Sequence, residues 1–146
     1  LSTMMPRYQP YGSGLMAEHE EGPEAEINPY KGTFDLLKAT KEIKDAVPGG
    51  IFVCTGLTWL EQFGGNVAAG GIRDGWFDLG GFGRQGFAYP DFAKDLLQDK
   101  TMYRNKCCVL CDKCYDLIQI GHCQTGCVMR DQEVYLPLYK KNVLKK

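Results

Sequence analysis

The sequence has few histidines, no long apolar run and almost no net charge, and each shortage excludes a class of protein. Its two histidines, His19 and His122, provide no Ser/His/Asp set. A net charge of −1 offers no basic surface for a nucleic acid. No apolar stretch is long enough to predict a membrane span or a signal peptide. Neither G-x-G-x-x-G nor G-x-x-x-x-G-K-[ST] occurs, so no Rossmann or P-loop site is predicted.

Cysteine is plentiful instead, and its spacing is the most informative feature of the chain. Four of the seven cysteines, Cys108, Cys111, Cys114 and Cys127, follow the pattern C-x2-C-x2-C-x12-C. Four converging thiolates suit zinc or an iron–sulfur cluster, because both favour soft sulfur ligands. The first three thiols lie too close together in sequence to act as independent disulfide staples. The pattern therefore predicts a metal centre in a reducing, cytosolic protein.

The remaining cysteines have simpler interpretations. Cys54 ends the apolar run Ile51–Cys54, which predicts a buried thiol that packs like a small hydrophobe. Cys107 and Cys123 stand beside the motif and are interpreted as bystanders, with a ligand role as the alternative. His122 lies within the same segment, but four thiolates already complete a site. A position beside the site or in solvent is therefore predicted for His122.

The order of the predicted elements is helix, strand, helix, strand, helix. That alternation indicates an α/β architecture with parallel strands. Short apolar strands without alternation are typical of sheets buried on both faces, and the first strand is of this kind. A short extended tail is predicted to follow the cysteine segment. The predicted elements are a helix over Thr33–Val47, a strand over Ile51–Cys54, a glycine-interrupted helix over Trp59–Ala69 that Gly70-Gly71 ends, a strand over Phe77–Phe82, a helix after Tyr89-Pro90-Asp91, and the tail over Val134–Tyr139.

Two glycine-bearing loops follow the two predicted strands. Ligands of parallel α/β sheets bind at this end of the strands. Glycine lets backbone N–H groups approach a phosphate closely, and an arginine adds a charge-assisted hydrogen bond. The same glycines also fit plain tight turns. The turn interpretation is stronger for Thr55-Gly56, whereas the two interpretations are evenly matched for Gly81–Arg84, where a Gly-Arg pair lies at the strand end.

These loops and the cysteine motif, in this order, resemble the C-terminal part of the FMN-binding (β/α)8 barrel of the old yellow enzyme superfamily. The resemblance is to its iron–sulfur branch, which includes NADH:flavin oxidoreductases, 2,4-dienoyl-CoA reductase and trimethylamine dehydrogenase. The segment Gly81–Asp91 is similar to the strand-eight phosphate loop of that family. The cysteine spacing is similar to the cluster motif of the trimethylamine dehydrogenase type.

The resemblance implies two cofactors and NAD(P)H as the electron donor. Cys108, Cys111, Cys114 and Cys127 would hold a [4Fe–4S] cluster. The FMN phosphate would lie among Thr55, Gly56, Gly81, Gly83 and Arg84. Residues that contact the flavin ring and the substrate are expected in the barrel strands that this chain lacks.

The resemblance also predicts how the chain is organised. Residues 1–105 would be the last βα units of the TIM barrel, from about the end of strand six to helix eight. Residues 106–146 would be the cysteine-rich cluster segment and the tail. Strands one to five would belong to the same, longer polypeptide, which agrees with a first residue that is Leu rather than Met.

The predicted function is therefore that of the C-terminal portion of a cytoplasmic FMN- and [4Fe–4S]-dependent NAD(P)H:flavin oxidoreductase. An enzyme of this kind acts on a small molecule, as an ene-reductase or an amine dehydrogenase. The alternative is a small structural zinc module with a four-cysteine site and no catalysis. A triplet C-x2-C-x2-C is less usual for zinc, where paired C-x2-C knuckles are the common arrangement.

Overall fold

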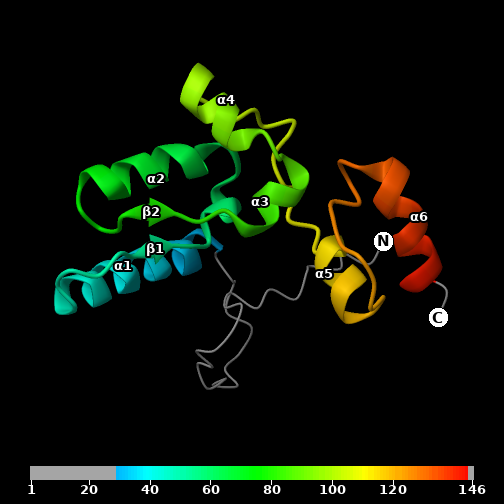
Figure 1. Ribbon diagram of the computed structural model, residues 1–146, viewed down its shortest axis with the longest axis horizontal. Helices are drawn as coiled ribbons and strands as arrows, with labels where there is room; N and C mark the ends of the chain where they lie inside the picture. The colour runs from blue at the N-terminus through cyan, green and yellow to red at the C-terminus, as the bar shows by residue number, and fades with distance from the viewer. Residues whose placement is uncertain (1–28, 145–146) are drawn as a thin grey trace.

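The computed structural model describes residues 29–144, which form mostly helices and one small parallel sheet (Figure 1). The acidic stretch at residues 18–26 and the rest of residues 1–28 lie outside the described part. No helix within residues 29–144 is long and apolar enough to cross a membrane. The elements are α1 (Pro29–Ala46), β1 (Val53–Cys54), the 3-10 helix η1 (Leu57–Phe63), α2 (Gly64–Arg73), β2 (Leu79–Gly80), α3 (Gly83–Ala88), α4 (Phe92–Asp99), α5 (Lys113–Gln119) and α6 (Gln132–Asn142).

The two strands pair in parallel, with Val53 opposite Leu79 and Cys54 opposite Gly80. Parallel neighbours need a crossover connection, and here η1 and α2 provide it. The predicted parallel pair joined by a helix is confirmed, although each strand is two residues long. Both strands end at the same edge of the sheet, so the loops that follow them lie side by side.

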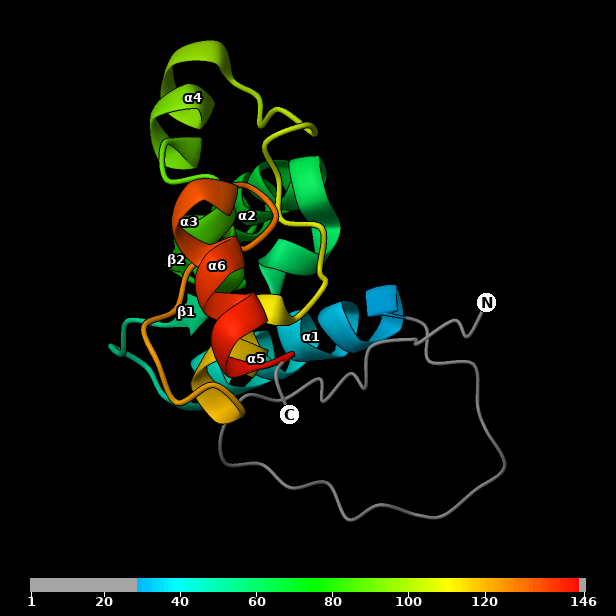
Figure 2. The same cartoon turned by 90° about the vertical axis from the view of Figure 1, so that its right-hand side faces the viewer.

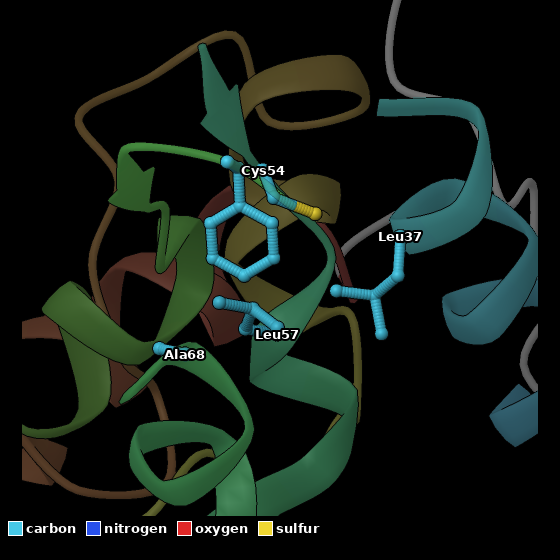
Figure 3. Close-up of a cluster of buried hydrophobic side chains, with 5 residues drawn as sticks. Leu37, Cys54, Leu57 and Ala68 are labelled. Carbon is cyan, nitrogen blue, oxygen red and sulfur yellow. The ribbon is translucent and has the colours of Figure 1, made fainter. Parts of the chain in front are cut away.

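One face of the sheet carries the core. Cys54 and Leu57 are fully buried against Leu37 of α1 and Ala68 of α2 (Figure 3). The Thr40 hydroxyl donates a hydrogen bond to the Cys54 sulfur at 3.7 Å. Burial raises the pKa of the Cys54 thiol, and this hydrogen bond partly offsets the rise. The prediction that Cys54 is a buried packing residue is confirmed.

The opposite face of the sheet is bare, so the prediction of a strand buried on both faces is wrong for the described chain. Val53 and Leu79, which are partners across the sheet, are 51% and 54% exposed. Ile51, two residues before Val53 on the same face, is 79% exposed. Side chains alternate between the faces of a strand, and α1 and α2 cover the face that holds Cys54. The apolar run signals a buried strand, but nothing in residues 29–144 covers its second face.

The second helix also differs from the prediction. It continues through Gly70 and Gly71 to Arg73 instead of ending at the glycine pair. A side chain at Gly71 would overlap the ring of Phe77, which is itself buried in the core. Gly71 therefore serves close packing inside a helix, and it does not break that helix.

The C-terminal tail is the helix α6, so the predicted extended conformation over Val134–Tyr139 is wrong. The Asp131 carboxylate accepts a hydrogen bond from the Val134 N–H and caps the first turn. The Tyr139 hydroxyl donates to Asp116 of α5 at 2.9 Å, and burial with this bond raises the pKa of Tyr139 to about 12. Pro137 lies inside the helix and argues locally against a helical prediction. The contact with α5 stabilises the helix, and this contact is not visible in the local sequence.

Leu57 gives a direct test of this core. Its side chain has no exposed surface, so Leu57→Ala removes buried methyl groups and leaves a cavity. We expect a loss of about 2–5 kcal/mol in the free energy of unfolding, measured by urea titration. Leu97→Ala is the matched control because Leu97 is 72% exposed, and it should change stability by less than about 0.5 kcal/mol. Equal losses in the two variants would contradict the core described above.

Candidate functional site

A cavity of about 440 Å³ lies at the carboxyl ends of β1 and β2. The loops after both strands line it, together with the start of η1. All five residues predicted to surround a phosphate are among its walls. The lining residues are Thr55, Gly56, Thr58, Trp59, Gly81, Phe82, Gly83 and Arg84. The sequence interpretation thus placed five residues of two separate loops at one cavity.

Arg84 brings positive charge to this cavity from the start of α3. Its guanidinium lies over the ring of Trp59, 5.3 Å from the ring centre. Its Nη1 group donates a hydrogen bond to the Asp112 carboxylate, in an ion pair whose side chains are only 25% and 24% exposed. A guanidinium has five N–H donors, so this bond leaves donors for a further anion. The Arg84 guanidinium, which lines the cavity, therefore keeps N–H donors besides the one that pairs with Asp112.

The glycines that line the cavity differ in whether the fold requires a glycine at their position. Gly56 has a φ of 84°, a left-handed conformation in which side chains are strained, and it precedes η1. A side chain at Gly81 would press on Thr55 Cγ2 at 3.0 Å and on the Cys54 carbonyl oxygen at 3.2 Å. At Gly83, in contrast, an added Cβ meets no atom within 4 Å. The fold itself therefore does not require a glycine at position 83.

The cysteine segment packs against α3, beside this cavity. Figure 1 shows α3 between the sheet and the pair α5 and α6, and Figure 2 shows α6 in front of α3. Cys108 and Cys127 are both 8% exposed and share a buried cluster with Ala88 of α3. The Gln85 side-chain oxygen accepts a hydrogen bond from the Cys108 N–H at 3.1 Å. Residues of α3 thus fix the first cysteine of the motif directly.

The four motif cysteines lie close enough to influence one another electrostatically. Burial raises the pKa of the Cys108 thiol, and Cys127 and Cys111 raise it further. Burial also raises the pKa of the Cys114 thiol, with added contributions from Cys108 and Cys111. Arg84 acts in the opposite direction on both thiols and favours their thiolate forms. The Arg84 charge therefore reaches the cysteine site as well as the cavity.

The donor set fits an iron–sulfur cluster in its chemistry. All seven cysteines lie in the described residues, and each is a free thiol. The Leu110 N–H donates a hydrogen bond to Cys108 Sγ at 3.4 Å, and such bonds to the sulfurs help to set a cluster's potential. Within residues 29–144, no group of three or more His, Cys, Asp or Glu side chains is arranged so that it could hold a metal ion. The fit to a cluster therefore rests on the number and the kind of the donors.

Three residues beside the cysteine motif, Cys107, Cys123 and His122, have surroundings of their own. Cys107 is 2% exposed, and its thiol donates to the Tyr103 carbonyl at 3.4 Å. Burial raises its pKa, and the Gln85 amide nearby partly offsets this. Cys123 donates to the Leu117 carbonyl at 3.6 Å, and His122 is exposed. The interpretation of Cys107 and Cys123 as bystanders, with a ligand role as the alternative, stays a prediction.

Sequence reasoning missed Trp59, Gln85 and Asp112. Asp112 lies between two predicted ligands, Cys111 and Cys114. An acidic residue at such a position could have indicated a role beside the site. Gln85 has no exposed surface, and within residues 29–144 its amide nitrogen lacks a hydrogen-bond acceptor of good geometry. Its burial depends on α3, a six-residue helix with two glycines that local sequence does not predict.

No protein-family model, curated protein or solved structure matches the chain. The likeness to the old yellow enzyme superfamily therefore rests on the residues of the two loops and the cysteine motif. It stays a prediction.

Proposed function

We propose that this chain is the C-terminal part of an FMN- and [4Fe–4S]-dependent NAD(P)H:flavin oxidoreductase of the old yellow enzyme superfamily. One observation carries the proposal. The cavity at the strand ends and the four-cysteine segment meet at Arg84, which lines the first and is paired with Asp112 inside the second. A flavin phosphate at the cavity would thus lie beside the cluster, as the resemblance implies.

The sheet supports a partial barrel. In a (β/α)8 barrel the helices cover the outer face, and side chains from all the strands fill the inner face. Here α1 and α2 cover one face, and Ile51, Val53 and Leu79 stand exposed on the other. A sheet that is covered on one face only agrees with the proposal that these are the last strands of a barrel. The missing N-terminal barrel strands of the same polypeptide are the partner we propose for this face.

The residues have distinct roles in this proposal. Backbone groups of Thr55, Gly56, Gly81 and Gly83 and the Arg84 side chain would bind and orient the phosphate. The four cysteine thiolates would hold the cluster beside it. FMN would supply hydride chemistry and the cluster single-electron transfer. The substrate is a small molecule, reduced at an activated C=C bond or oxidised as an amine, and the protein works in the cytoplasm.

Flavin affinity tests the role of Arg84. In the full-length polypeptide, Arg84→Ala should weaken FMN binding by about 1.5–3 kcal/mol, because a charged hydrogen bond to the phosphate is lost. This loss corresponds to a rise in Kd of roughly ten- to 150-fold, measured by quenching of flavin fluorescence. Arg73→Ala is the matched control, because Arg73 pairs with Asp74 on the exposed surface of α2. Its flavin affinity should equal that of the wild type.

Gly83 tests the backbone contacts separately. A Cβ at this position meets no neighbour, and we expect Gly83→Leu to fold and to obstruct a ligand of the cavity. Unchanged FMN affinity in both Arg84→Ala and Gly83→Leu would show that the phosphate does not bind at this cavity.

A further inference from the structure

Asp112 connects the cysteine motif to the cavity through one charged contact. It lies between Cys111 and Cys114 and has a φ of 56°, a left-handed conformation that Asp tolerates better than most residues. Its carboxylate accepts the hydrogen bond from Arg84, and its backbone carbonyl accepts one from the Tyr115 N–H at 2.8 Å. The direction of the Asp112 side chain is thus set by the same loop that carries the cysteines.

Arg84 is held from two sides. The Trp59 ring, from η1, lies under the guanidinium, and Asp112 pairs with it on the side of the cysteine loop. The adjacent residue, Gln85, holds the Cys108 N–H at 3.1 Å. Two consecutive residues of α3 therefore contact two residues of the cysteine motif. A shift of the cysteine loop would therefore move Asp112, the ion-pair partner of the Arg84 guanidinium at the cavity.

We propose that Asp112 is a positioning residue, through which an ordered cysteine loop sets the affinity of the cavity for a phosphate group. Metal–thiolate bonds at Cys111 and Cys114 would fix the backbone on both sides of Asp112. The fixed carboxylate would then hold the Arg84 guanidinium over Trp59, with its remaining N–H groups ready for the phosphate. Flavin binding and cluster binding would be coupled through one ion pair. The inference rests on the proposed function, and it adds to it a reciprocal dependence of the two sites.

The test is a comparison of flavin affinities in the full-length polypeptide. FMN and riboflavin, which lacks the phosphate, are titrated against cluster-loaded protein and against protein depleted of iron by a chelator. We expect iron depletion to weaken FMN binding by at least about fivefold, a typical size for coupled sites. Riboflavin binding should change much less, because riboflavin lacks the phosphate group that Arg84 would contact.

Variants then locate the coupling. The measured quantity is the ratio of the FMN Kd of iron-depleted protein to that of cluster-loaded protein. In Asp112→Ala this ratio should be about one. Glu133→Gln, which removes an exposed acid of α6 in the same segment, should keep the wild-type ratio. If Asp112→Ala takes up no iron, Arg84→Gln removes the other partner of the ion pair and should also give a ratio of about one.

Any of three results would overturn the inference. The first is an FMN Kd ratio of about one in the wild type, and the second is an equal effect of iron depletion on riboflavin binding. The third is the wild-type Kd ratio in the variant that lacks the ion pair. A wild-type protein that binds no FMN or no iron would instead contradict the proposed function itself. The two failures are therefore distinguishable.

Discussion

Replacing Cys108, Cys111, Cys114 or Cys127 by alanine is expected to remove most of the iron from the full-length protein. A [4Fe–4S] cluster contains about four iron and four sulfide ions and depends on four thiolates. Cys108 and Cys127 share one buried cluster. Cys111 lies close enough to raise the pKa values of both the Cys108 and the Cys114 thiols. Loss of any one ligand should therefore destabilise the whole centre. Iron and acid-labile sulfide are measured after anaerobic purification.

The three other cysteines are internal controls for this experiment. Cys54 of β1 packs in the core against Leu37 of α1, and Cys107 and Cys123 donate hydrogen bonds to backbone carbonyls. Their alanine variants should keep wild-type iron. Cys54→Ala should also cost about 1 kcal/mol in the free energy of unfolding through lost packing. Unchanged iron in all four motif variants would show that the ligand assignment is wrong.

The isolated chain of 146 residues is expected to show no NAD(P)H oxidation and poor solubility. In the proposed function it is about a quarter of an eight-stranded barrel, without the strands that we expect to contact the flavin ring. Within residues 29–144, the exposed apolar face formed by Ile51, Val53 and Leu79 and the unpaired outer edges of the two strands favour aggregation.

The assay follows NAD(P)H consumption with added FMN and an enone acceptor, and the full-length polypeptide is the positive control. Iron uptake by the isolated chain on anaerobic reconstitution is still expected, because the cysteine ligands are nearly local in sequence. Sustained turnover by this chain alone would mean that a complete active site lies within it. The partial-barrel proposal would then be wrong.

Elements with a strong periodic signal could be predicted from the sequence. The helix expected over Thr33–Val47 is observed as α1, Pro29–Ala46, because its apolar residues recur at helical spacing. The two strands and their parallel pairing follow from apolar runs separated by a helix. Five cavity residues could be placed together because parallel strands end at one edge of a sheet.

Features that depend on tertiary contacts could not be predicted. The short helices α3 and α5 have six and seven residues, too few for a clear period. α6 contains Pro137, which argues locally against a helix, and the bond from Tyr139 to Asp116 is invisible in the sequence. The ion pair of Arg84 with Asp112 joins residues 28 positions apart, so no local pattern indicates it.

The most direct test of the proposed function is the absorption spectrum of the full-length protein after anaerobic purification, with analysis of its metals. We predict flavin bands above a broad iron–sulfur absorbance, with about four iron and four sulfide ions per chain. FMN should be released on denaturation. A colourless protein that contains one zinc ion per chain and no flavin would contradict the proposal and support a structural four-cysteine zinc module.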